Sequence, residues 1–211
     1  MAPANPPSST RRCYSNGRTA LLRLPVNSPE MKNLIRFLVS KKVALTSTLP
    51  VVEPYTNREV VLGGGLESLV PQLQERETAT WKQNQQKDTA SIRLFKKEMA
   101  WEKQFYDAGG LLVAGTDPTG AGRTVAGYAN HRQVELLVEA GLTPVEAIKI
   151  STLNGATYLG REKEIGTIEA GKQADLILIN GDPEMDIQQI RKMETVFKKA
   201  LASTPLSCLN P

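Results

Sequence analysis

The stretch LLVAGTDPTG, residues 111–120, decides the fold class. Residues 111–115 are a short apolar run with turn-forming residues on both sides. Continuous rather than alternating hydrophobicity is typical of a strand covered on both faces, as in the parallel sheets of α/β proteins. Because open sheets and barrels both bind ligands at the carboxyl ends of such strands, the chemistry is expected just after Gly115.

The segment before this strand carries a second unit of the same class. Residues 28–30, Ser-Pro-Glu, supply a capping hydroxyl, a proline for the first helical position and an acid near the positive end of the helix dipole. One apolar stripe at helical spacing follows: Met31, Leu34, Ile35, Leu38 and Val39. Residues 43–49, rich in Val, Thr and Leu, then predict a strand, so the order is helix then strand, as in α/β proteins.

Helices are also expected on both sides of the 111–115 strand. Residues 54–75 are turn-rich and predict a surface excursion, and residues 78–108 fit one long helix or two joined ones ended by Gly109. A further helix is expected near residues 130–140. Thr143 and Glu146 form the pattern of a capping box, which begins the next helix.

The carboxyl-terminal part of the sequence has the pattern of short strands joined by turns. Residues 165–168 and 174–179 predict the two strands of a β-hairpin, with a short helix at 186–192 and a strand at 195–198 after it. Residues 1–27 and 200–211 have no helical or strand periodicity. We expect 1–27 to be disordered and foreign to the rest of the chain, and 200–211 to be an aperiodic tail.

Composition and charge exclude several classes of function. Four of the 26 basic residues lie within residues 1–26, which hold no acid, so the remainder carries 22 basic and 22 acidic residues. Nucleic-acid binding needs a concentrated basic face, so no nucleic-acid partner is expected. The sequence holds neither an apolar run of about 18 residues nor a secretory signal, which predicts no membrane association and a cytoplasmic location by default. Two cysteines and one histidine are too few for a site made wholly of His and Cys.

Asp117 is the main candidate for chemistry. A carboxylate at the carboxyl end of a buried strand suits either a metal ligand or a general base for a bound water. The alternative is that Asp117 caps its own loop, as Asp often does before Pro and Gly. His131 lies close by in sequence and could reach a ligand, although a solitary histidine is more often a surface or capping residue.

Two nucleotide-binding motifs fail in the same loop. A phosphate-binding loop of the form GxxxxGK[ST] needs lysine where Ala121 stands. A GxGxxG fingerprint beginning at Gly120 finds Val125 in place of its third glycine.

Three stretches together carry a family resemblance: LLVAGTDPTG, HRQVELLVEAGLTPVEAIKISTLNGATYLG and IGTIEAGKQADLILINGDP. In this order they resemble the carboxyl-terminal part of the metal-dependent amidohydrolase superfamily, in particular its imidazolonepropionase-like and dipeptidase-like members. The resemblance implies the last strands and helices of a (β/α)8 barrel over residues 28–160, with residues 43–49 and 111–115 as its seventh and eighth strands. It also implies a hairpin and strand of an accessory β-sandwich over residues 161–199.

The resemblance further implies an activity and a site. Members carry one or two divalent metals, usually zinc, and hydrolyse amide-like C–N bonds of small molecules such as amides, cyclic amides and dipeptides. Asp117 matches the aspartate that binds metal and takes a proton from the attacking water. Thr119, Gly120 and His131 are expected beside the small-molecule substrate, and Lys172 and Asp175 match structural residues of the hairpin.

The chain also departs from the family pattern. A His-x-His pair, a lysine and two further histidines of the metal site have no counterparts, and one carboxylate cannot hold catalytic zinc, which takes about three protein ligands. We therefore expect a truncated product that binds metal weakly or not at all and is inactive alone. The alternative is a non-catalytic remnant or interaction module that persists with a partner or by self-association through exposed barrel edges.

Overall fold

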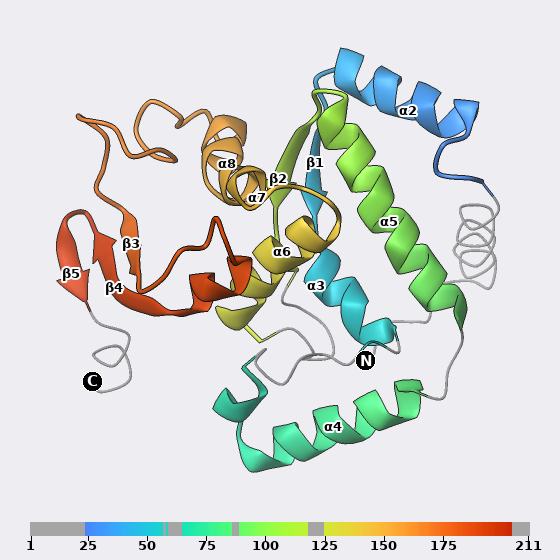
Figure 1. The fold of residues 1–211 in the computed structure, drawn as a ribbon, viewed down its shortest axis with the longest axis horizontal. Helices are drawn as coiled ribbons and strands as arrows, with labels where there is room; N and C mark the ends of the chain where they lie inside the picture. Colours follow the sequence, from blue (N-terminus) through green and yellow to red (C-terminus); the bar gives the residue numbers. More distant parts are fainter. Residues whose placement is uncertain (1–23, 57, 59–64, 86–88, 118–124, 204–211) are drawn as a thin grey trace, which may run out of the picture.

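The computed structural model describes residues 24–56, 58, 65–85, 89–117 and 125–203. Most of the segment for which disorder was predicted, and residues 204–211 of the tail, therefore lie outside the described residues. The elements in chain order are α2 (Pro29–Ser40), β1 (Ala44–Ser47), α3 (Leu49–Val52), η1 (Glu53–Tyr55), η2 (Leu66–Ser68), α4 (Pro71–Gln85), α5 (Thr89–Asp107), β2 (Leu111–Ala114), α6 (Tyr128–Glu139), α7 (Pro144–Ser151), α8 (Leu153–Tyr158), β3 (Leu176–Ile179), η3 (Ile187–Arg191), β4 (Met193–Lys198) and β5 (Leu201–Ser203) (Figure 1).

The strands β1 and β2 lie side by side and parallel, as the sequence predicts (Figure 1). Their register pairs Ala44 with Leu111 and Ser47 with Ala114, so the carboxyl ends of both strands lie at one edge. Each strand is shorter than expected. β1 ends at Ser47 because α3 begins at Leu49, with a proline in its first turn.

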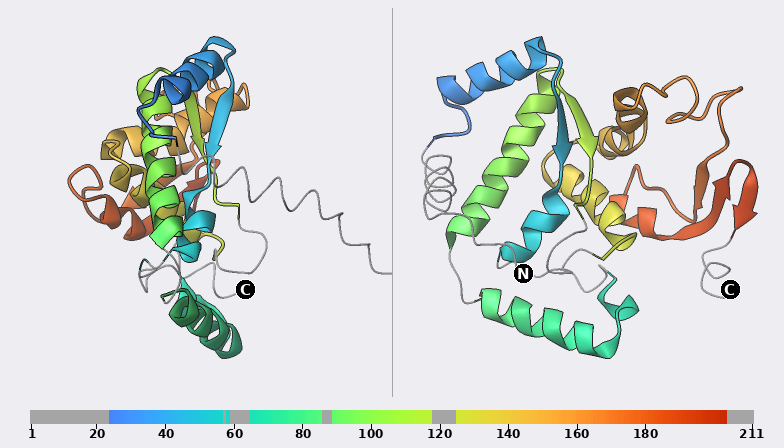
Figure 2. Two further views of the ribbon diagram at one scale, coloured as in Figure 1. Left: turned by 90° about the vertical axis from the view of Figure 1, so that its right-hand side faces the viewer. Right: turned by 180° about the vertical axis from the view of Figure 1, so that it is seen from behind.

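Helices that precede β2 in the sequence and helices that follow it bury the strand pair. α5, α7 and α8 contact β2, and in Figure 2 α5 and α6 lie on the same side of the two strands. The main apolar cluster draws on α2, α5, β2, α6, α7 and η3; its fully buried side chains are Phe105, Leu112, Leu137, Ala147 and Ile150. Together with the parallel strands, this packing makes the fold of the described residues α/β.

Both predicted helix caps are present. The Ser28 hydroxyl accepts a hydrogen bond from the Met31 amide at 3.3 Å, and α2 buries Met31. At α7 the Thr143 hydroxyl accepts from the Glu146 amide at 3.2 Å, while the Glu146 carboxylate accepts from the Thr143 amide at 2.8 Å. Such reciprocal bonds satisfy two exposed backbone donors, so the α7 capping box is confirmed.

The region before β2 differs from the prediction in part. Two helices, α4 and α5, replace the stretch 78–108, which is one of the two arrangements expected, and Gly109 ends α5 with a φ of 85°. However, α4 begins at Pro71, so the end of the predicted turn-rich segment 54–75 is helical. The sequence hid this because α4 is mostly polar and its few apolar residues form no continuous stripe.

The predicted hairpin is wrong. Residues 165–168 form no strand, and β3 pairs antiparallel with β4, with Leu176 opposite Phe197. β5 adds to the other edge of β4, so the expected aperiodic tail begins with a strand. The carboxylate of Asp175 accepts from the Lys199 amide at 2.9 Å and from the Lys198 ammonium at 2.5 Å, which ties the start of β3 to the end of β4.

Lys172 donates a hydrogen bond to Thr167, and its turn is closed by the bond from the Gln173 amide to the Glu164 carbonyl at 2.9 Å. Residues 165–172 therefore form a turn-rich segment that these internal bonds hold, and β3 takes its strand partner from residues 193–198. Among the described residues no helix combines the length and the hydrophobicity needed to span a bilayer.

Candidate functional site

Asp117 lies just beyond the carboxyl end of β2. The Gly115 amide continues the pairing of the two strands by donating to the Ser47 carbonyl at 2.8 Å. Two residues later Asp117 is exposed and has a φ of 45°, a left-handed conformation that Asp tolerates better than most residues. The structure thus places this carboxylate at the edge where α/β proteins bind ligands, as the sequence predicts.

The other residues expected beside the substrate fare differently. Thr119 and Gly120 lie outside the described residues. His131 is half-buried in the first turn of α6. Burial lowers the pKa of His131, the Arg191 charge lowers it further and Glu135 raises it, so the imidazole is neutral at pH 7. A role for His131 beside a substrate stays a prediction.

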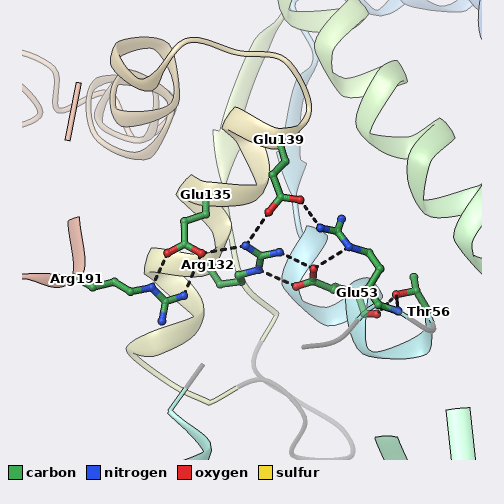
Figure 3. Close-up of polar contacts among 7 residues, drawn as sticks. Glu53, Thr56, Arg132, Glu135, Glu139 and Arg191 are labelled. Atoms are coloured by element: carbon green, nitrogen blue, oxygen red, sulfur yellow. Dashed lines mark hydrogen bonds and ion pairs between the residues drawn. The ribbon is translucent and has the colours of Figure 1, made fainter. Parts of the chain in front are cut away.

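A network of charged side chains is centred on Arg132 of α6, the residue after His131 in the sequence (Figure 3). The Arg132 guanidinium contacts both oxygens of Glu53 in η1, with Nη2 to Oε1 at 2.7 Å and Nε to Oε2 at 2.9 Å. The Glu53 side chain is only 2% exposed. Burial lowers the pKa of Arg132, but the hydrogen bonds and charge of Glu53, with Glu135 and Glu139, raise it above its ordinary value. The Arg132 guanidinium therefore keeps its positive charge.

Glu135 extends this network to η3. Its carboxylate accepts from Arg132 Nη1 at 3.0 Å and from Arg191 Nη2 at 3.0 Å. Burial raises the pKa of Glu135, but the hydrogen bonds and charges of the two arginines outweigh it and leave the pKa below its ordinary value. Glu139, one helical turn further on, contacts Arg132 at 2.8 Å and also pairs with Arg58. The network ties η1, α6 and η3 together.

A second, buried polar cluster lies where β1, α5 and α6 meet. The Ser47 hydroxyl donates to Glu102 Oε2 at 2.7 Å and accepts from Gln133 Nε2 at 2.7 Å. None of the three side chains belongs to a residue more than 3% exposed. Burial raises the pKa of Glu102 to about 8; the Ser47 hydrogen bond opposes the rise and the charge of Glu98 adds to it.

Sequence reasoning missed both clusters. Arg132 and Glu135 have the i,i+3 spacing of a helical ion pair, which was the one local signal for the network. The partners on other elements are far apart in sequence, 79 residues for Arg132 and Glu53 and 55 for Ser47 and Glu102. No local pattern reports contacts at such separations.

The described residues do not by themselves fit a catalytic metal. Within them no group of three His, Cys, Asp or Glu side chains could hold an ion. Asp117 offers one carboxylate, whereas a catalytic zinc takes about three protein ligands. Any metal that Asp117 binds therefore needs ligands from elsewhere.

Comparison with known proteins identifies the family of the chain. A model described as "Amidohydrolase family" matches residues 81–202, more than half of the chain, and its match includes β2, Asp117, β3, β4 and the first two residues of β5. The chain belongs to the amidohydrolase family. The resemblance inferred from the sequence motifs is thereby confirmed.

Curated relatives of this amidohydrolase chain act on C–N bonds according to their names. A 5-methylthioadenosine/S-adenosylhomocysteine deaminase of Moorella thermoacetica is 42% identical over 85 residues, which are 37% of this chain and 20% of that protein. An imidazolonepropionase of Shouchella clausii is 42% identical over 60 residues, 27% of this chain and 13% of that protein. The chain thus spans a fifth or less of the length of these relatives.

Solved structures agree on the fold. A crystal structure of a protein from Bifidobacterium longum assigned as a prolidase is 28% identical, with a TM-score of 0.54 over 76% of this chain and 35% of that one. An ochratoxinase of A. niger, at 21% identity and a TM-score of 0.55, covers 82% of this chain and 34% of its own. The second likeness shows the fold alone.

Proposed function

We propose that this chain forms the last two strand-and-helix units of a catalytic (β/α)8 barrel that hydrolyses C–N bonds of small molecules. The observation that carries the proposal is the exposed Asp117 carboxylate at the carboxyl end of β2, beside the parallel strand β1. The names of the relatives, which include deaminases and an imidazolonepropionase, support a C–N bond other than the ordinary peptide bond. The substrate class is therefore a small amide, cyclic amide or dipeptide-like compound.

Asp117 takes the central chemical part in this proposal. As an exposed carboxylate it accepts a proton from a water molecule, whose oxygen then attacks the carbon of the C–N bond. The nitrogen leaves with a proton, so the water is divided between the two products. The family implies a divalent metal, which we propose to be zinc, and this metal would supply a Lewis acid. Asp117 would be one of its ligands, with the others contributed by residues outside those described.

Three further residues are proposed to lie beside the substrate. Thr119 and Gly120 follow Asp117 in the sequence after the intervening Pro118. His131 lies in the first turn of α6, the helix that follows this loop, and as a neutral imidazole it can both donate and accept a hydrogen bond.

The test compares hydrolysis by two preparations on a panel of N-acyl amino acids, cyclic amides and dipeptides, with and without zinc. One preparation is the protein isolated from its own cells, which retains whatever completes the site, and the other is the recombinant chain. We expect zinc-dependent hydrolysis by the first, lost in Asp117→Asn and kept in Asp107→Asn. Asp107 is the matched control because it is an exposed aspartate at the end of α5, paired with Lys103. Hydrolysis that survives Asp117→Asn would refute the proposal.

A second candidate is a non-catalytic module that self-associates. Within the described sheets β1 and β3 each pair with a single strand, and β3 exposes Ile177 and Leu178 at 55% and 49%. Unpaired strand edges with apolar side chains invite pairing with another chain. Absence of hydrolysis by both preparations, with a dimer in sedimentation that Ile177→Lys dissociates, would favour this candidate.

A further inference from the structure

The buried cluster of Ser47, Glu102 and Gln133 has no part in the chemistry proposed above, yet it adjoins the carboxyl end of β1, which pairs with β2 three residues before Asp117. Ser47 is the last residue of β1, and α5 and α6 hold its side chain from two directions through Glu102 and Gln133. Hydrogen bonds to a charged or strongly polar buried group are among the more costly to lose. The position of the carboxyl end of β1 is therefore fixed by side chains as well as by strand pairing.

This fixed strand end holds the backbone that leads to Asp117. The Ser47 carbonyl accepts the Gly115 amide at 2.8 Å. A Cβ atom on Gly115 would lie 2.7 Å from Thr46 Cγ2, which shows how closely the Thr46 side chain packs against the Gly115 backbone. Asp117 follows two residues later with its left-handed φ of 45°. Although Asp tolerates this conformation better than most residues, its cost must be offset by the structure around it.

We propose that Glu102 is a positioning residue, which acts through Ser47 on the Gly115 backbone and so holds the Asp117 carboxylate in place. The inference rests on the proposed function for the importance of Asp117, but the contacts that carry it do not depend on that function. Glu102 itself lies in the core and touches no reacting atom.

The protonation state of Glu102 gives the positioning role a signature. Its pKa of about 8 means that the carboxyl keeps its proton at neutral pH. The proton also adds a donor to a cluster in which the buried Gln133 Oε1 has no partner among the described residues. Above pH 8 a buried negative charge appears against Ser47.

Among the described residues, no cation contributes to the shift in the pKa of Glu102. Besides Ser47 of β1, the group that acts on it is the Glu98 carboxylate, one turn earlier on α5. Gln133 of α6 reaches it through Ser47, and the Arg58 cation lies over the Phe95 ring, two turns before Glu102. Ionisation of Glu102 therefore meets a like charge and changes the hydrogen bond that Ser47 donates, so the Gly115 amide should sense it through the Ser47 carbonyl.

The experiment follows backbone amides of the full chain by NMR. We expect Glu102→Ala and Ser47→Ala to lower the exchange protection of the Gly115 amide at least tenfold, while the Leu142 amide, which bonds the Leu137 carbonyl in another part of the core, changes less than twofold. Glu102→Gln resembles the protonated acid in shape and should keep protection at Gly115. Glu98→Gln, the matched control on the same helix, should keep it as well.

A pH titration separates positioning from mere packing. In the wild-type chain the chemical shift of the Gly115 amide should change with pH, with a midpoint near pH 8. The midpoint should fall in Glu98→Gln. In Glu102→Gln the pH dependence of this chemical shift should vanish. This measurement needs no alanine variant, so it remains decisive if Glu102→Ala fails to fold. Equal losses of protection at Gly115 and Leu142, or a Gly115 shift that ignores pH in the wild type, would overturn the proposal.

The outcome stays distinct from that of the proposed function. If Asp117→Asn leaves hydrolysis intact while Gly115 still depends on Glu102, the function fails and the positioning stands. If hydrolysis depends on Asp117, Glu102→Ala should lower kcat at least tenfold with KM unchanged within threefold, and Glu102→Gln should restore kcat.

Discussion

Arg132 and Glu53 form a two-bond ion pair between α6 and η1, at 2.7 and 2.9 Å, across 79 residues of sequence (Figure 3). η1 follows β1 by way of α3, and α6 follows the loop after β2. The pair therefore joins the two segments that leave the carboxyl ends of the parallel strands. It limits how far these segments can separate.

Arg132→Met should lower the free energy of unfolding by about 3 kcal/mol, measured by urea denaturation at pH 7. The substitution keeps the apolar stem but leaves the buried Glu53 charge with only the more distant Arg58 Nε, at 3.5 Å. Removing one partner of a buried ion pair costs more than the pair contributes, because the other charge stays buried.

Arg161→Met is the matched control for that substitution. Arg161 pairs with Glu164, and both side chains are about half exposed or more. Exposed pairs contribute less than about 1 kcal/mol. Equal losses in the two variants would show that the Arg132 network is no stronger than a surface pair.

Glu102→Gln should flatten the dependence of stability on pH. The pKa of Glu102 is about 8 in the folded chain and near its ordinary value of 4.5 once unfolded. Between these values the folded state keeps a proton that the unfolded state has lost, so the free energy of unfolding falls as pH rises, by at most about 1.4 kcal/mol per pH unit. The variant lacks this titrating group, so its free energy of unfolding should rise relative to that of the wild type from pH 5 to pH 8.

Chemical denaturation at pH 5, 6, 7 and 8 measures this difference. Glu164→Gln, at an exposed glutamate, should follow the wild-type curve. Parallel curves for the wild type and Glu102→Gln would show that the buried carboxyl does not keep its proton.

Local sequence patterns predicted the structural features that depend on residues close together in the sequence. The caps at Ser28 and Thr143, the buried strand after Gly110 and the glycine end of α5 all depend on residues within four positions of each other. The partner of β3 could not be predicted in this way, because Leu176 pairs with Phe197 rather than with the nearest strand-like stretch. For the same reason the sequence offered Asp117 as a candidate but gave no sign of the contact between Glu102 and Ser47.

Gly115→Ala should destabilise the chain by about 1–3 kcal/mol, and Thr46→Ser should recover most of this loss. The added Cβ would meet Thr46 Cγ2 at 2.7 Å, whereas the Ser47 carbonyl, at 3.4 Å, is in a tight but tolerable contact. Serine lacks the Cγ2 methyl group, so the double variant removes the closest contact. Thermal unfolding of the single and double variants measures the coupling. Additive effects would place the strain elsewhere.

The recombinant chain should bind zinc no more tightly than micromolar. Asp117 is one carboxylate, and the described residues bring no two other His, Cys, Asp or Glu side chains to it in a metal-binding group. A zinc site with nanomolar affinity takes about three or four protein ligands in fixed geometry. Isothermal titration with zinc, on the wild type and on Asp117→Asn, provides the measurement. Nanomolar binding of one equivalent that Asp117→Asn abolishes would mean that residues outside the described ranges complete the site within this chain, and the enzyme would then need no further polypeptide to hold its metal.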